Sequence, residues 1–134
     1  MTVSDEMRNL NKCKSILIVE DEPSIRENLK FLLELEGYPV FTAVDGKEGL
    51  QVLRKMPRPC LVLLDLLMPV MNGMEFLEAK SHEDAIASIP VCVVSGVSED
   101  PKLAQVSAFV KKPIHFEGLL KFVKHYCGSI PSST

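Results

Sequence analysis

The sequence contains acidic side chains placed where they could act as a nucleophile or bind a metal. Asp65 directly follows the apolar run 61–64, and Glu20 and Asp21 follow a second apolar run over 15–19. A carboxylate at the end of a buried parallel strand faces the crevice where open α/β sheets bind their ligands. Asp65 is therefore a candidate nucleophile.

Apolar runs of strand length alternate with helical patterns along the chain. Short β-branched runs predict strands, and apolar residues repeating every three or four positions predict helices. Gly37 can end the first helix, Asp45 and Asn72 can cap the next two, and Pro39 favours an edge position for the second strand. The predicted strands are 15–19, 40–43, 60–65, 91–95 and 108–111, and the predicted helices are 23–36, 45–56, one that follows Asn72, and one from Phe116 that ends at Gly128.

This order of elements predicts one doubly wound α/β domain. Strands joined through helices across short turns form a parallel sheet with right-handed crossovers and helices on both faces. A chain of 134 residues can bury a single core without disulfides or metals holding it together. We expect a polar N-terminal extension over 1–14, the domain over 15–127 and a C-terminal tail over 128–134.

Composition excludes several classes of function. A net charge of -3 and the absence of a Lys/Arg stripe argue against nucleic-acid binding. The polar N-terminus resembles neither a signal peptide nor a membrane span, so we expect a cytoplasmic protein. The four cysteines form no CxxC pair and are predicted to be reduced thiols, and the three histidines show no metal-site spacing. The cysteines are Cys13, Cys60, Cys92 and Cys127, and the histidines are His82, His115 and His125.

In a parallel sheet, the residues that follow each strand converge on one edge. That edge would gather Glu20, Asp21 and Asp65 with Ser95 and Lys112. Three neighbouring carboxylates repel one another unless a divalent cation neutralises them. The cluster therefore predicts a metal site, and Mg²⁺ suits hard oxygen ligands best.

Five fragments at these strand ends occur in the order found in response-regulator receiver domains, which the chain resembles over about 15–126. They are Ile18-Val19-Glu20-Asp21-Glu22, Leu64-Asp65-Leu66-Leu67-Met68-Pro69, Asn72-Gly73, Val94-Ser95-Gly96 and Lys112-Pro113. The resemblance implies a flavodoxin-like three-layer sandwich, with five parallel strands in the order 2-1-3-4-5. It implies a signalling phosphoacceptor rather than an enzyme, with only self-phosphorylation and slow self-dephosphorylation.

The resemblance also assigns roles to individual residues. It makes Asp65 the phosphorylated residue and gives Mg²⁺, or Mn²⁺ as the alternative, the ligands Asp21, Asp65 and the carbonyl of Leu67, with Glu20 reaching a metal-bound water. Strand side chains alternate, so only one of Lys111 and Lys112 can point into the site. Lys112 is the one expected to contact Asp65 or the phosphoryl group, because it precedes Pro113. Lys112-Pro113 is expected to be cis. Ser95 and Phe109 are the expected switch pair, with Ser95 donating to the phosphoryl group.

The chain departs from this family between Ser95 and Lys112. The two residues are 17 positions apart, several fewer than in most receivers. A helix rises only about 1.5 Å per residue, so a full helix with two turns does not fit there. We predict a shortened fourth helix that starts near Pro101, and an altered output face.

Three functions are compatible with the pattern, in decreasing order of support. The first is a receiver that accepts a phosphoryl group from a sensor histidine kinase or histidine phosphotransfer protein and then switches binding of a downstream protein target. The second is a phosphorylation-independent interaction module of the same fold. The third, a flavin-binding domain, lacks a phosphate-cradling turn after the first strand. We expect a monomer or weak dimer without membrane or nucleic-acid contacts.

Overall fold

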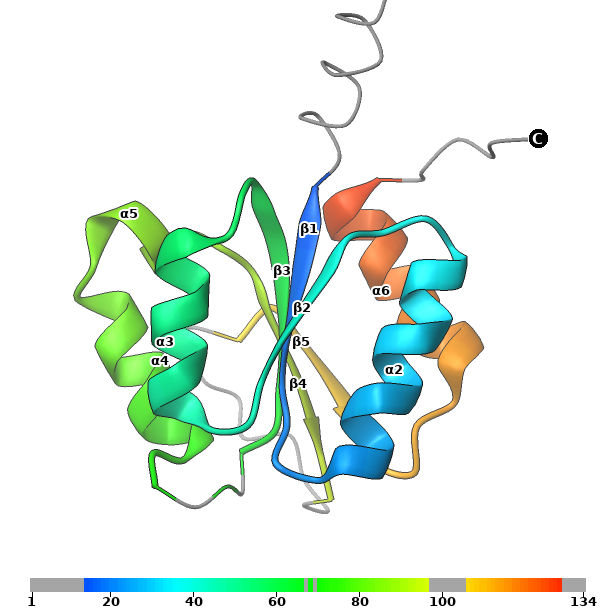
Figure 1. The fold of residues 1–134 in the computed structure, drawn as a ribbon, viewed down its shortest axis with the longest axis horizontal. Coiled ribbons are helices and arrows are strands. Elements are labelled where there is room, and N and C mark those ends of the chain that lie inside the picture. The colour runs from blue at the N-terminus through cyan, green and yellow to red at the C-terminus, as the bar shows by residue number, and fades with distance from the viewer. Residues whose placement is uncertain (1–13, 67, 69, 97–105, 129–134) are drawn as a thin grey trace, which may run out of the picture.

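A computed structural model describes residues 14–66, 68, 70–96 and 106–128. Its centre is one parallel sheet with the strand order β2-β1-β3-β4-β5, which confirms the predicted doubly wound topology (Figure 1). The strands are β1 (Ser15–Val19), β2 (Val40–Ala43), β3 (Pro59–Leu64), β4 (Val91–Ser95) and β5 (Ala108–Lys111). The helices are α2 (Pro23–Leu35), α3 (Gly46–Lys55), α4 (Gly73–Ser81), α5 (Asp84–Ala87) and α6 (Phe116–Cys127).

The sheet is covered on both faces, as Figure 1 shows, with α2 and α6 on one side and α3, α4 and α5 on the other. Side chains alternate along each strand, so β1 sends Ile16 and Ile18 to the first face and Leu17 and Val19 to the second. All four are at most 1% exposed. Burial on both faces explains why the strands are continuous apolar runs rather than alternating patterns.

The predicted helix ends follow local chemistry. Gly37 adopts a φ of 98°, a left-handed conformation that a residue with a Cβ rarely takes. The Asp45 side chain accepts the backbone N–H of Glu48 and caps α3. Asn72 and Glu75 form a reciprocal capping box at the start of α4. Asp45 and Asn72 thus fix where α3 and α4 begin, at the sheet edge that carries the acidic residues, whereas Gly37 ends α2 at the opposite edge, before β2.

Two features differ from the sequence-based expectations. The short helix α5 was not predicted, because its four residues are too few to show a periodic pattern. Cys60 and Cys127 form a disulfide, so the prediction of reduced thiols is wrong for this pair. Cys60 lies at the start of β3 and Cys127 at the end of α6, and only the tertiary fold brings them together. Cys92 is free and buried, as predicted, and Cys13 lies outside the described residues.

The predicted shortened helix cannot be compared with the structure. Residues 97–105, where it was expected, lie outside the described part of the chain, as does Leu67.

Candidate functional site

The carboxyl ends of β1 and β3 bring three acidic side chains together. One carboxylate oxygen each from Glu20, Asp21 and Asp65 lies within 4.8 Å of the others. Glu20 and Asp65 are only 3% and 6% exposed, whereas Asp21 is exposed. Because β1 and β3 flank the point where the strand order reverses, the cluster occupies the position where doubly wound sheets bind ligands.

Lys112 is the cation of this cluster. Its Nζ lies 2.8 Å from Oε1 of Glu20 and 3.5 Å from Oδ2 of Asp65. Lys112 follows β5, and its backbone N–H donates to the carbonyl of Ser95 at the end of β4, 2.8 Å away. The Lys112-Pro113 peptide bond is cis. The neighbouring Lys111 is exposed and makes no ion pair with any described residue.

The pKa values of Glu20 and Lys112 reflect this burial and pairing. The pKa of Glu20 is raised to about 7, mainly by burial and also by the charge of Asp65, against the lowering effect of the hydrogen bond from Lys112. For Lys112, burial disfavours the charged form, but the contacts with Glu20 and Asp65 outweigh burial and raise its pKa. The cluster thus contains three carboxylates and one lysine, which contacts two of them, so its negative groups outnumber its positive ones.

The acidic turn after β1 is held by groups that sequence reasoning did not identify. The Arg26 side chain, from the first turns of α2, donates through one NH group to the carbonyls of Glu20 and Asp21, at 3.0 and 3.3 Å. The backbone N–H of Glu22 donates to the Glu20 carboxylate at 3.2 Å. The position of Arg26 shortly after the acidic run is the only sequence signal that could have indicated this contact.

The turn after β3 depends on Gly73. A Cβ at this position would lie 2.6 Å from Cα of Leu66 and 2.8 Å from the carbonyl oxygen of Asp65. Its N–H donates to the Leu66 carbonyl at 3.0 Å. The N-terminus of α4 therefore packs directly on the backbone that carries Asp65, which explains the Asn72-Gly73 fragment in physical terms.

The two expected switch residues lie in different environments. Ser95 is fully buried, and no described residue offers its Oγ a hydrogen-bond partner. Buried hydroxyl groups are normally satisfied, so this one marks a place for a polar ligand or water. Phe109 is partly buried against the core cluster on the α3 and α4 side of the sheet. In the pairing of β4 with β5, Phe109 lies opposite Val93 and Ser95 lies opposite Lys111.

The residues present fit a hard divalent cation. Carboxylate oxygens are the preferred ligands of Mg²⁺, and the excess of negative charge at the cluster favours an added cation. The unpaired Ser95 hydroxyl, at the end of β4, is a further polar group that is not satisfied by the described residues. Asp21, Asp65 and Glu20 are the described groups that could bind the metal or its waters.

Comparison with known proteins agrees with this geometry. Residues 16–124 match the family model of the response regulator receiver domain. DivK, a polar-differentiation response regulator from Brucella anthropi, is 30% identical over 120 residues, which cover 86% of this chain and 97% of DivK. The chain therefore belongs to the response regulator receiver family, a class of signalling domains in two-component systems.

Solved structures show the same fold. The chemotaxis protein CheY4 of Vibrio cholerae is 30% identical with a TM-score of 0.76, and the match covers 84% of this chain and 98% of CheY4. The response regulator TrrA of Thermotoga maritima, solved in complex with Mg(2+)-BeF, is 31% identical with a TM-score of 0.74, covering 84% of this chain and 98% of TrrA.

Some relatives are longer than the matched region. RpaA of Synechocystis, described as a DNA-binding dual master transcriptional regulator, is 31% identical over 81% of this chain, but the match spans only 47% of RpaA. Among the described residues, no helix has the length and apolar character required to cross a bilayer.

Proposed function

We propose that Asp65 accepts a phosphoryl group from a phosphohistidine on a sensor kinase or phosphotransfer protein, and that the phosphorylated domain switches its binding of a downstream target. The observation that supports this best is the placement of a nearly buried Asp65 carboxylate beside Lys112 and two further carboxylates. An Oδ atom of Asp65 attacks phosphorus, the P–N bond to the imidazole breaks, and the leaving imidazole keeps the nitrogen electron pair and binds a proton.

Each neighbouring side chain has a distinct part in this reaction. Lys112 places its ammonium group against Asp65 and the negative charge that spreads over the transferring group. Ser95 donates its otherwise unpaired hydroxyl to a phosphoryl oxygen. Asp21 and Asp65, with Glu20 through a water, are the proposed Mg²⁺ site, and the bound cation supplies positive charge to the phosphoryl oxygens.

A groove beside Lys112 suits docking of the phosphodonor protein. It has a volume of about 470 Å³ and runs between α2 and residues 112–116. Ile25, Leu29 and Phe116 give it apolar walls, and Ser24 and Asn28 give it a polar rim. A donor seated there would lie next to the lysine that contacts Asp65.

The direct test is phosphorylation by acetyl phosphate with Mg²⁺, followed by intact-mass spectrometry. The wild type should gain one phosphoryl group, and EDTA should abolish the gain. Asp65→Asn should gain none, whereas the matched control Asp84→Asn, at the exposed start of α5, should behave as wild type. A phosphoryl gain in Asp65→Asn equal to the wild type would refute the assignment. Target binding that is identical with and without phosphodonor would favour the phosphorylation-independent module.

The docking groove has its own test. Asn28→Arg places a bulky cation in the groove and should reduce phosphoryl transfer from a phosphodonor protein at least tenfold, or about 1.4 kcal/mol. Phosphorylation by acetyl phosphate should be unchanged, because the small donor does not need the groove. Gln51→Arg, on the exposed side of α3, is the matched control and should leave both reactions intact. If the phosphodonor protein transferred its phosphoryl group equally well to Asn28→Arg and to Gln51→Arg, this docking surface would be ruled out.

A further inference from the structure

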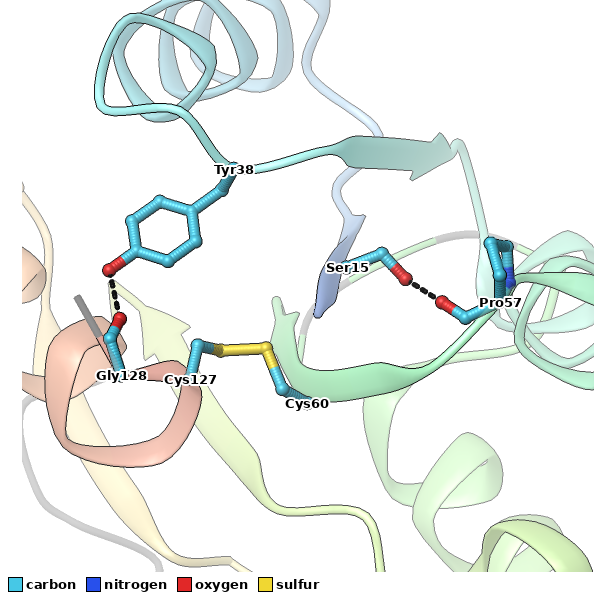
Figure 2. Close-up of a disulfide and its surroundings, with 6 residues drawn as sticks. All are labelled: Ser15, Tyr38, Pro57, Cys60, Cys127 and Gly128. Atoms are coloured by element: carbon cyan, nitrogen blue, oxygen red, sulfur yellow. Dashed lines mark hydrogen bonds between the residues drawn. A yellow bond between two sulfur atoms is a disulfide. The ribbon is translucent and has the colours of Figure 1, made fainter. Parts of the chain in front are cut away.

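The disulfide lies at the edge of the sheet opposite the acidic cluster. It joins the second residue of β3 to the last residue of α6, across 67 positions and a Cα–Cα distance of 5.3 Å (Figure 2). Both cysteines are only 6% exposed. None of the chemistry proposed for Asp65 uses this pair, so its role has to be explained separately.

Only Cys60 of the pair is among the described residues that line a groove. Cys60 lines a hollow of about 330 Å³, together with Lys14, Arg58, Pro59, Pro90 and Tyr126. Cys127 is not among the lining residues. A reagent in this groove would therefore approach the disulfide from the Cys60 side.

The groove is positively charged. Lys14 and Arg58 are both exposed, and neither forms an ion pair with any residue that the structure describes. None of the described residues that line the groove carries a carboxylate. Unpaired cations beside a disulfide favour a negatively charged reactant over a neutral or positively charged one.

The fold near the disulfide has other supports. Figure 2 shows the Tyr38 hydroxyl donating to the carbonyl of Gly128, just beyond α6, at 2.5 Å. Leu119 and Val123 of α6 are fully buried against the sheet. These contacts hold the end of α6 independently of the disulfide, so we expect the bond to open and close within the native fold.

We propose that Cys60–Cys127 is a reversible thiol–disulfide exchange site for an anionic low-molecular-weight thiol of the glutathione class, which binds in the groove through its carboxylates. The thiolate attacks Sγ of Cys60, a mixed disulfide forms on Cys60, and Cys127 leaves as a thiolate that takes a proton from solvent. A second thiolate attacks the sulfur of the bound thiol. This step releases the oxidised small-molecule disulfide and the Cys60 thiolate, so two small thiols supply the two electrons.

The same exchange run in reverse, with the oxidised small-molecule disulfide, restores the bond. Disulfides that form in reducing compartments are usually transient and serve catalysis or redox sensing. A reversible disulfide in a receiver domain is consistent with that pattern. Cys92 does not compete, because it is buried in β4 and burial raises its pKa to about 12. The inference does not depend on phosphorylation of Asp65.

The test compares reduction rates in a Cys13→Ser background, with the disulfide followed by mass spectrometry of alkylated protein. Glutathione and the positively charged cysteamine are used at equal thiolate concentrations. We expect glutathione to react at least fivefold faster at low salt, an advantage that high salt should reduce because exposed charges are screened. Glutathione should appear transiently on Cys60.

Matched variants decide the interpretation. Arg58→Gln and Lys14→Gln should each reduce the preference for glutathione, and the double variant should abolish it. Lys47→Gln, which removes the same charge from an exposed position of α3, should retain it. Equal reactivity of the two thiols with the background protein would overturn the proposal. A preference for glutathione that the double variant retains would also overturn it. So would the finding that Cys60 and Cys127 stay as free thiols in protein equilibrated with oxidised glutathione.

Discussion

At the scale of single residues, Lys112 is shared between two carboxylates. Its Nζ is closer to Glu20, at 2.8 Å, than to Asp65, at 3.5 Å. A charge-assisted hydrogen bond is strongest at the shorter distance, so Glu20 is the main partner of the Lys112 ammonium and Asp65 is the weaker one. Residue types and strand ends predicted that these groups would meet. They did not predict which carboxylate would hold the lysine, because that depends on side-chain packing.

Gly73 gives a residue-scale prediction. Gly73→Ala places a Cβ 2.6 Å from Cα of Leu66, and the backbone that carries Asp65 must shift. We expect phosphorylation by acetyl phosphate to slow at least about tenfold, since small displacements of reacting groups have large effects on rate. The free energy of unfolding should fall by about 1–3 kcal/mol.

Gly118→Ala is the control for that change. Apart from its chain neighbours and the backbone of α6 itself, no atom of the described residues lies within 4 Å of a Cβ at this position, so this variant should phosphorylate as wild type and gain up to about 1 kcal/mol in stability. Chemical denaturation and mass spectrometry measure the two effects. A Gly73→Ala protein that phosphorylates at the wild-type rate would contradict the argument.

At the scale of elements, the strands and helices that could be predicted were those marked by short-range sequence patterns. Apolar runs, prolines and capping residues predicted all five strands and four of the described helices. The structure places Asp65 one position beyond β3, whereas the prediction had included it in the strand. The short helix α5 was missed, and so was the anchoring of its end by Lys80, whose Nζ donates to the Ala87 carbonyl at 2.9 Å. A lysine in α4 gives no sequence signal that it will be buried.

Lys80 gives the prediction for this scale. Burial lowers its pKa below 10.5 in the folded protein. Between that lowered pKa and 10.5, the unfolded chain binds more protons than the folded one, so the contribution of Lys80 to stability rises with pH. The free energy of unfolding of wild type minus that of Lys80→Met should therefore increase from neutral pH to about pH 10.

Urea denaturation across that pH range measures this difference. Lys47→Met, which removes an exposed lysine, should give a difference that stays flat. A Lys80→Met difference that is flat or falls with pH would show that burial does not control the titration of Lys80.

At the scale of the whole molecule, the disulfide closes most of the domain into a loop. Its two cysteines are 67 positions apart, and sequence reasoning missed the pair because neither its spacing nor its neighbours mark it. The chain-entropy model assigns a loop of this length about 4 kcal/mol of stabilisation. Nothing local could have indicated it, since the two residues meet only once the sheet and α6 have assembled.

Replacing both cysteines tests that value. The Cys60→Ser, Cys127→Ser double variant should lose about 4 kcal/mol of unfolding free energy relative to the oxidised wild type, and reduced wild type should lose a similar amount. Urea denaturation with and without a reductant measures both. If reductant left the stability of the wild type unchanged while the double variant was destabilised, the loss would come from packing rather than from the covalent link.

Strand β3 carries a reactive residue at each end. Cys60 lies at its start and Asp65 directly follows its last residue, about 17 Å away in an extended chain. The strand is hydrogen-bonded to β1 and β4 and nearly all of it is buried. We therefore expect it to keep Cys60 and Asp65 at a fixed separation. We therefore expect the proposed thiol–disulfide exchange at one end and the proposed phosphoryl transfer at the other to proceed independently. One small domain would then hold two separate signals as distinct covalent states.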